Sequence, residues 1–317
     1  MTDISIVIPT YNRSKFIAEA IQSCYAAADG LRLQVVVVDD ASTDASEEVI
    51  RRYPVEYIRF EKNCGRRVAR NTGKENSVGL YLKYLDSDDV LEPSSLRKEF
   101  DLAVRSGADI VVGGWHSSEY SKDGTERIVG TCMAPRFENI IDDILAGKAV
   151  PTGAALYRRD FIRDVAWAAV GPLDDWDYFI HAAIKNGTIV SLPDPVYRWR
   201  HHDGERVSGK SMVVTAQSFY RVLDRLHECL VESEQLSEPR RRRLAQYYYK
   251  ELRVLFRFKS ELASKVEKTI HSLDARFLPI DEERSRVIRM LARVFPLHWL
   301  MVGYGVGRRI LDKLDNS

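Results

Sequence analysis

The sequence predicts an α/β fold with a mostly parallel sheet, followed by a helical C-terminal region. Short β-branched runs such as "ISIVIP" and "QVVVVDD" alternate with segments of helical period. Residues 35–38 are all valine, which is typical of a strand covered by helices on both faces. Three polar loops, "PTYNR", "DDAS" and "DSDD", follow predicted strands. Because ligands of such sheets bind beyond the carboxyl ends of the strands, we expect these loops to line one crevice.

Strands and helices alternate regularly through the first 115 residues. The apolar positions of the first helix fall on one face: Ile17, Ala20, Ile21 and Cys24. Asp44 and Glu47 form a D-x-x-E pattern, which predicts an N-cap and a second helix. We expect further strands at "VEYIRF", "LYLKYLD" and "DIVVGGW", and helices over residues 66–77 and after Pro93.

The alternation weakens after residue 115. Residues 116–136 are expected to form an irregular polar loop with an edge strand, and a short apolar helix should follow near residues 137–145. The run "GAALYRR" predicts another strand. The run "DDWDYFIHAAIKNG" predicts a helix with Gly187 at its C-cap, and "TIVSLPDPVYRWRHHDG" should return as strand and loop.

A domain boundary is expected near the end of this stretch, with residues 1–212 as the α/β domain and residues 213–317 as a helical region. The first helix of that region has an apolar stripe of Phe219, Val222, Leu223, Leu226 and Leu230. A long helix should begin at Pro239. The segment "VFPLHWLMVGYGVG", residues 294–307, is strongly apolar but too short and too broken for a membrane span.

The composition fits a soluble globular protein with a sizeable core. The chain has 317 residues, of which 45% are hydrophobic and 29% charged. Its four cysteines form no CxxC pair, so we expect neither a zinc site nor a disulfide framework, and a reducing compartment. The N-terminus "MTDISIVIPT" lacks the basic start and long apolar stretch of a signal peptide, which favours a cytoplasmic location.

The charge is unevenly distributed, although the net charge is only +1. Residues 1–239 carry 29 Lys and Arg against 37 Asp and Glu, whereas residues 240–317 carry 18 against 9. An acidic body with a basic tail suggests that the two parts meet different partners.

The loop "YLDSDDV" places Asp86, Asp88 and Asp89 within four positions at a strand end. These carboxylates repel one another, and a divalent cation would remove that repulsion. Mg²⁺ and Mn²⁺ prefer oxygen ligands and often share their coordination shell with substrate phosphates. The alternative is a solvated acidic turn, which is common.

Four motifs, "IVIPTYNR", "VVVVDDASTD", "ARNTG" and "YLDSDDV", occur in this order at strand ends or helix starts. Over residues 3–205 the sequence therefore resembles the family-2 glycosyltransferases of the GT-A fold. The resemblance implies a nucleotide-diphosphosugar transferase fold and a cofactor of Mn²⁺ or Mg²⁺. It also implies inverting transfer of a sugar from a UDP- or dTDP-sugar to a saccharide or lipid-linked saccharide acceptor, in surface polysaccharide synthesis.

The resemblance places the nucleotide base at the first two loops. Pro9, Thr10 and Tyr11 match the stretch that lies against the base, and Asp39 matches the acid that hydrogen-bonds the base. Tyr11 has the alternative of a packed core aromatic. Asp39 and its neighbour Asp40 have the alternative of capping the turn that follows, which we favour for Asp40.

The same comparison assigns residues near the diphosphate. Arg70 matches a residue beside the base and diphosphate, Asp86 the first acid of the DxD motif near ribose and metal, and Asp88 the bridging metal ligand. Arg66 and Arg67 depart from the family pattern, which often has small residues there. They either meet phosphate or acceptor charge or are solvated, and we favour solvation for at least one.

Inverting transfer needs a base that accepts the proton of the acceptor hydroxyl. Asp175 matches the family base, the second member of an acidic pair that opens a helix. The pair is usually Glu-Asp, so Asp174 is one methylene shorter and is a candidate substrate contact. The helix N-terminus should lower the pKa of Asp175. Alternatively, Asp174, Asp175 and Asp177 only stabilise that helix.

The segment "YRWRHHDGERVS" resembles the family's closing segment, so that His202 or His201 would reach the metal or the diphosphate. A structural histidine is the alternative. Trp176 and Trp199 have flat apolar side chains suited to a sugar ring, with core packing as the alternative.

Two other functions remain as alternatives. A nucleotidyltransferase usually has a glycine-rich loop after its first strand, and "PTYNRSKF" has none. A non-catalytic nucleotide-sugar-binding module would not need both Asp88 and Asp175. No nucleic-acid partner is expected. The tail is expected to pack on the domain or on another subunit of a homo-oligomer, or to lie peripherally on the inner face of the cell membrane.

Overall fold

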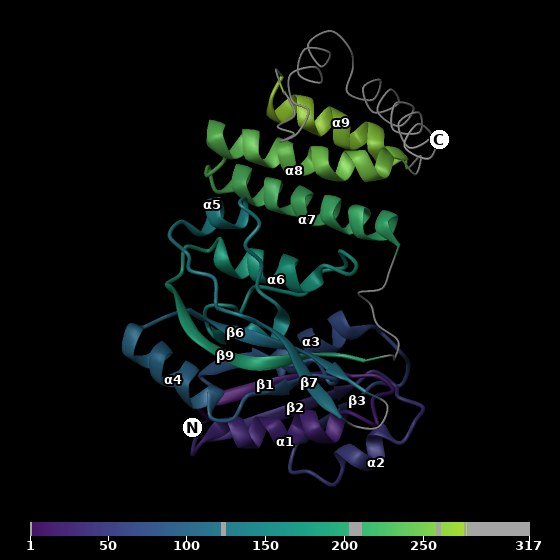
Figure 1. The fold of residues 1–317 in the computed structure, drawn as a ribbon, viewed down its shortest axis with the longest axis vertical. Helices are drawn as coiled ribbons and strands as arrows, with labels where there is room; N and C mark the ends of the chain where they lie inside the picture. The colour runs from purple at the N-terminus through teal and green to yellow at the C-terminus, as the bar shows by residue number, and fades with distance from the viewer. Residues whose placement is uncertain (1, 122–124, 203–210, 258–260, 276, 278–317) are drawn as a thin grey trace, which may run out of the picture. The chain divides into compact units, whose positions relative to one another are not determined.

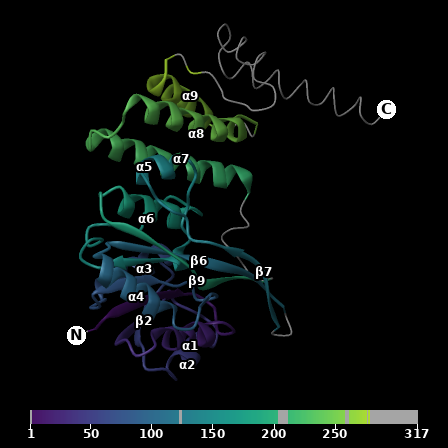
Figure 2. The same cartoon turned by 60° about the vertical axis from the view of Figure 1, so that its left-hand side comes forward.

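The structure is a computed structural model that describes residues 2–121, 125–202, 211–257, 261–275 and 277. The chain forms two compact units. The first comprises Met1–Ala169 and Asp174–Arg206, and the second comprises Val170–Leu173 and Val207–Ser317. Figures 1 and 2 show the helices and strands of both units.

The first unit is built on a nine-stranded sheet with the strand order β3-β2-β1-β4-β8-β6-β9-β5, and β7 pairs with β6 (Figure 1). The strands are β1 (Ile4–Thr10), β2 (Leu33–Asp39), β3 (Glu56–Arg59), β4 (Tyr81–Tyr84), β5 (Val90–Leu91), β6 (Ile110–Tyr120), β7 (Glu126–Cys132), β8 (Ala155–Arg158) and β9 (Ile189–His201). The predicted strands are all present, and the α/β fold class is confirmed.

The strands β3, β2, β1 and β4 are parallel to one another. Their register aligns Thr10 with Asp39, and Asp39 with Arg59, so the strands end at one edge. Beyond β4 the sheet is mixed, because β8 runs antiparallel to both β4 and β6 and β5 runs antiparallel to β9. The parallel pattern thus holds for the strands that precede the three polar loops.

Helices cover both faces of this sheet. The helices of this unit are α1 (Ile17–Ala28), α2 (Ser46–Ile50), α3 (Arg66–Glu75), α4 (Ser95–Ser106), α5 (Ile140–Ile144) and α6 (Asp174–Ala183), with a 3₁₀ turn η1 (Thr152–Ala154). Helices α1 and α2 lie on one face, and α3 and α6 on the other (Figure 1). Gly73 lets α3 approach β1, because a Cβ there would collide with the Val7 side chain.

A buried ion pair joins strand β4 to helix α4. The Lys83 Nζ lies 2.7 Å from the Glu99 Oε1, and both side chains are fully buried. Burial lowers the pKa of Lys83 and raises the pKa of Glu99, while their mutual attraction opposes both shifts. Removal of one partner would leave an uncompensated buried charge, so the pair fixes α4 against the strand that leads to Asp86.

The helix expected after Asp44 is present as α2, although Ala45 rather than Asp44 occupies its N-cap position. The Asp44 carboxylate accepts the N–H of Ser46, the first residue of α2, and the N–H of Ser14. The expected C-cap at Gly187 was wrong. Helix α6 ends at Ala183, and Asn186 rather than Gly187 adopts a left-handed conformation, with φ of 60°. A Cβ at Gly187 would collide with the Phe161 ring.

The irregular loop expected from residue 116 is shorter than predicted. Strand β6 continues to Tyr120 because β9 and β7 pair with its second half, and β7 supplies the expected edge strand. Figure 2 shows β6 and β7 running side by side.

The second unit contains the helices α7 (Met212–Glu232), α8 (Glu238–Arg257) and α9 (Leu262–Leu273). Helix α8 packs on both α7 and α9. The buried side chains of the α7 stripe are Val222, Leu223, Leu226 and Leu230, and those of α8 include Leu244, Leu252 and Leu255. The apolar stripes thus pack against helices of their own unit. The segment 294–307 lies outside the described residues.

Among the helices that the structure describes, none combines the length and the apolarity needed to cross a bilayer.

Candidate active site

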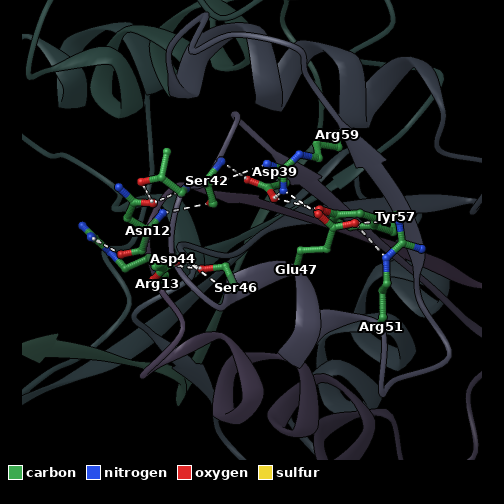
Figure 3. Close-up of polar contacts among 11 residues, drawn as sticks. Asn12, Arg13, Asp39, Ser42, Asp44, Ser46, Glu47, Arg51, Tyr57 and Arg59 are labelled. Atoms are coloured by element: carbon green, nitrogen blue, oxygen red, sulfur yellow. Dashed lines mark hydrogen bonds and ion pairs between the residues drawn. The ribbon is translucent and has the colours of Figure 1, made fainter.

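The first two polar loops are fastened to each other at the carboxyl edge of the sheet (Figure 3). The N–H of Asn12 donates to the Ser42 Oγ at 3.0 Å, and the Asn12 Oδ1 accepts the N–H of Thr43 at 2.8 Å. The N–H of Arg13 donates to the Ser46 Oγ at 2.9 Å. Asn12 has a φ of 51°, which an asparagine tolerates better than most residues. These bonds give the loops one fixed arrangement.

The three residues expected at the nucleotide base lie where β1 ends. Pro9 and Thr10 are buried, whereas Tyr11 is 42% exposed and is therefore not a core aromatic. The Thr10 hydroxyl is buried and has no hydrogen-bond partner within the described ranges. Buried hydroxyls usually have a partner, so this group is suited to a ligand contact.

Asp39 is fully buried and held by three donors (Figure 3). Its Oδ1 accepts the N–H of Ser42 at 2.8 Å, and its Oδ2 accepts the Tyr57 hydroxyl at 2.7 Å and the Arg59 guanidinium at 3.2 Å. Burial, followed by the bond to Asp39, raises the pKa of Tyr57 to about 12, so Tyr57 remains a donor. Asp39 thus caps the turn that follows, and its role toward a base stays a prediction.

Asp40 has a different role from the capping of the next turn. Its carboxylate accepts the N–H groups of Cys64 at 2.6 Å and Gly65 at 2.8 Å, directly before α3. The φ of Gly65 is 89°, a left-handed value that favours glycine. The end of β2 therefore fixes the start of α3.

Arg70 on α3 is buried between two carboxylates. Its Nη2 lies 2.5 Å from the Asp86 Oδ1, and its Nη1 lies 3.3 Å from the Asp174 Oδ2. The guanidinium also lies over the ring of Trp167, 4.1 Å from the centroid. Arg70 thus connects Asp86 of the DxD motif with Asp174 of the acidic pair on α6, and these two acids are far apart in sequence.

Arg66, one helical turn earlier, is paired rather than solvated. Its Nε and Nη2 donate to the two carboxylate oxygens of Asp174, at 2.8 and 2.6 Å. Neither this pair nor the position of Trp167 is evident from the sequence pattern, because the partners are about one hundred residues apart.

The acids of "DSDD" have separate environments. Asp86 is 37% exposed at its side chain and faces Arg70. The Asp88 Oδ2 lies 3.1 Å from the His202 Nε2 and 3.5 Å from the Arg13 Nε. Burial opposes ionisation of Asp88, but His202 and Arg13 together lower its pKa. Asp89 is buried and accepts the N–H of Arg200 at 2.9 Å.

Of the two candidate histidines, His202 is the one that lies against Asp88. Its ring stacks on Phe16 with a centroid distance of 4.6 Å. The His201 ring instead packs on Trp199, also at 4.6 Å. Trp199 is 38% exposed, whereas Trp176 is buried at 7%, so Trp199 offers more surface to a ligand.

Asp88 and His202 together form a candidate cation site. Within the described ranges, no three His, Cys, Asp or Glu side chains are grouped closely enough to hold a metal ion by themselves. Mg²⁺ and Mn²⁺, however, usually bind through one or two carboxylates and complete their shell with substrate phosphates and water. One carboxylate and one imidazole fit such an open site, although the metal assignment stays a prediction.

Asp175 lies half-buried in the first turn of α6. Burial, followed by the charge of Asp174, raises the pKa of Asp175 to about 6, while the N–H of Trp176 and the charges of Arg70 and Arg66 oppose this. The expectation of a lowered pKa was wrong, because burial and a like charge outweigh the helix N-terminus. A carboxylate with this pKa is suited to accept a proton near neutral pH.

Solved structures of glycosyltransferases have the same fold. The residue 1–349 fragment of Staphylococcus aureus TarS, in complex with UDP-GlcNAc, matches with a TM-score of 0.63 and 19% identity over 87% of this chain and 84% of that one. The mannosyltransferase PcManGT of Pyrobaculum calidifontis, in complex with GDP-Man and Mn²⁺, matches with a TM-score of 0.50 and 16% identity over 96% of this chain and 86% of that one. At these identities the likeness shows the fold alone.

Sequence relatives give the family. The succinoglycan biosynthesis protein ExoO of Rhizobium meliloti is 37% identical over 35% of this chain and 32% of its own length. TuaG of Bacillus subtilis, named for teichuronic acid biosynthesis, is 28% identical over 71% of this chain and 89% of its own. The chain thus spans about a third of the length of ExoO. The profile described as Glycosyl transferase family 2 matches residues 5–166, and the chain belongs to this family of enzymes.

Proposed function

We propose that the chain is an inverting glycosyltransferase that moves a sugar from a UDP- or dTDP-sugar to a saccharide or lipid-linked saccharide in surface polysaccharide synthesis. The geometry carries this proposal: the acidic pair Asp174 and Asp175 begins α6, and Arg70 joins that pair to Asp86 of the DxD loop. The names of ExoO and TuaG support a polysaccharide product. The TarS complex with UDP-GlcNAc supports a UDP-sugar donor.

In the proposed reaction the acceptor hydroxyl gives its proton to the Asp175 carboxylate. The acceptor oxygen then forms a bond to the anomeric carbon, the bond from that carbon to the diphosphate oxygen breaks, and the nucleoside diphosphate leaves. Attack from the face opposite to the leaving group inverts the anomeric carbon. Asp175 accelerates this step by general base catalysis, and the crevice adds in-line positioning of the two substrates.

On the donor side, we propose that Pro9, Thr10, Tyr11 and Asp39 meet the nucleotide base and that Asp86 meets the ribose. Asp88 and His202 would hold the divalent cation. A bound Mn²⁺ or Mg²⁺ would act as a Lewis acid that neutralises charge on the leaving diphosphate. Trp199, exposed beside His201, is the better candidate of the two tryptophans for a sugar contact.

We further propose that the second unit attaches the enzyme electrostatically to the inner face of the cell membrane. The apolar stripes of α7 and α8 are buried, whereas Arg241, Arg242 and Arg243 are exposed on α8. Clustered arginines attract anionic lipid headgroups, and an exposed arginine contributes about 1 kcal/mol near the surface. Arg242 also pairs with Glu238 on the same helix, so its contribution would be smaller.

The Asp175→Asn variant should bind nucleoside diphosphate like the wild type but lose about 10²–10⁴-fold in transfer rate, because Asn cannot accept the proton. Nucleotide binding by calorimetry and nucleoside diphosphate release provide the two readouts. Retained transfer would identify a different base. Asp164→Asn, a substitution at an exposed carboxylate, is the control and should leave both readouts unchanged.

The Asp175→Asn substitution should also change the free energy of unfolding in a pH-dependent way. The folded pKa of Asp175 is about 6, above the unfolded value of about 3.9, so its contribution to stability is present below pH 4 and lost as the pH rises through 6. Relative to the wild type, Asp175→Asn should therefore gain up to about 3 kcal/mol of unfolding free energy between pH 4 and pH 8. Denaturant unfolding at both pH values measures this, and a pH-independent difference would contradict the raised pKa.

Membrane attachment should be detectable by flotation of the full chain with vesicles. Vesicles that contain phosphatidylserine should carry the protein at low salt and release it at high salt, whereas purely phosphatidylcholine vesicles should not carry it. Replacement of Arg241, Arg242 and Arg243 by Gln should reduce flotation. Absence of binding to anionic vesicles at low salt would rule out this attachment.

A further inference from the structure

Arg66 and Asp174 form a two-point contact between α3 and the start of α6. The Nε–Oδ2 distance is 2.8 Å and the Nη2–Oδ1 distance is 2.6 Å. The Asp174 side chain is 6% exposed, whereas the Arg66 side chain is 32% exposed. A bidentate arginine–carboxylate pair fixes both the distance and the orientation of its partner.

The arginine itself starts from a fixed position. Asp40, at the end of β2, accepts the N–H groups of Cys64 and Gly65, and Arg66 is the next residue and the first of α3. A continuous series of contacts therefore runs from the end of β2 through Arg66 to Asp174. The residue that follows Asp174 is the proposed base.

We propose that Arg66 is a positioning residue, which clamps Asp174 and thereby fixes the first turn of α6 so that the Asp175 carboxylate is held toward the acceptor. This inference rests on the proposed function of Asp175. Arg70 does not replace the clamp, because its own bond to Asp174 is a single contact at 3.3 Å and its other arm is bound to Asp86.

An ordinary surface ion pair is the alternative to this role. Exposed pairs contribute little, since solvent screens both charges. Here one partner is buried, and the loss of Arg66 would leave the Asp174 charge with Arg70 as its remaining arginine contact in the described structure. A less compensated charge beside Asp175 favours the protonated form of that residue.

Several groups face Asp175 and affect its titration. Asp174 lies on the same helix, Arg70 and Arg66 lie on α3, and Tyr157 on β8 and Tyr197 on β9 are close enough to interact. Both tyrosines have pKa values raised by burial, so they remain neutral over the working pH range. Asp174 and the two arginines are thus the groups whose charges matter.

The experiment compares Arg66→Gln, Arg66→Lys and the control Arg67→Gln, each with and without Asp175→Asn. Arg67 is the matched control because it carries the same charge on the same turn of α3. For each pair, the difference in unfolding free energy is measured from pH 4 to pH 8. This difference changes between the unfolded and the folded pKa of Asp175, so its midpoint moves when the folded pKa moves, and the measurement requires no substrate.

In Arg66→Gln, this midpoint should move up by about half a pH unit or more, and kcat at pH 7 should fall about tenfold while nucleotide affinity stays unchanged. Arg66→Lys keeps the charge but loses the bidentate geometry, so the midpoint should stay in place while kcat falls. Arg67→Gln should match the wild type in both readouts. The kcat is measured as nucleoside diphosphate release from a nucleotide sugar that supports wild-type turnover.

A midpoint and kcat in Arg66→Gln equal to those in Arg67→Gln would overturn the positioning role, and so would wild-type kcat in Arg66→Lys. If Arg66→Gln does not fold, the comparison between Arg66→Lys and Arg67→Lys decides by kcat alone. Failure of the proposed function is a separate result, because full transfer activity in Asp175→Asn alone would refute the base whatever the midpoints show.

Discussion

The guanidinium of Arg70 lies between carboxylates from two distant parts of the chain and is almost fully buried. A buried cation is tolerated when opposite charges compensate it, and removal of one partner leaves a costly uncompensated charge. Asp86 on the loop after β4 and Asp174 at the start of α6 therefore have to meet at α3. This requirement joins the proposed donor side of the crevice to the proposed base.

The elements around Arg70 are arranged so that α3 has one position. Gly73 allows the helix to approach β1, Asp40 fixes its first residues, and Trp167 lies against the guanidinium of Arg70. The same charges determine the proton affinity of the proposed base. Burial and Asp174 raise the pKa of Asp175 to about 6, and the two arginines limit the rise. The cluster formed by Asp174, Asp175 and the two arginines thus stabilises the position of α6 and sets the pKa of the proposed base.

Much of the fold could be predicted from local pattern. The strands and the three polar loops follow from β-branched runs and from the residues that end them, and the four motifs in order indicated the family. Prediction from local pattern was wrong where a contact with a residue distant in sequence determines the local structure. The conformation near Gly187 depends on the Phe161 ring, and the length of β6 depends on its pairing with β7 and β9. The antiparallel strands β5 and β8 have no marker of direction in their sequences.

The candidate site could also be predicted only in part from the sequence. The residue types were evident from the sequence, but the pairing of Arg66 with Asp174 was not, because nothing local connects residues 108 positions apart. The pKa of Asp175 was mispredicted from the helix N-terminus alone, although the charge of the adjacent Asp174 opposes that effect. Burial, the larger influence, arises from tertiary packing.

We propose that the loops after β1, β2 and β4 form one site for a nucleoside diphosphate and a divalent cation. The most direct measurement is calorimetric titration of UDP and dTDP into the full chain, with and without Mn²⁺, in the wild type and in Asp88→Asn. We expect Mn²⁺ to tighten the binding of at least one nucleotide by about tenfold or more in the wild type, and Asp88→Asn to abolish this metal dependence. Equal affinity with and without Mn²⁺ in the wild type, or no binding of either nucleotide, would contradict it.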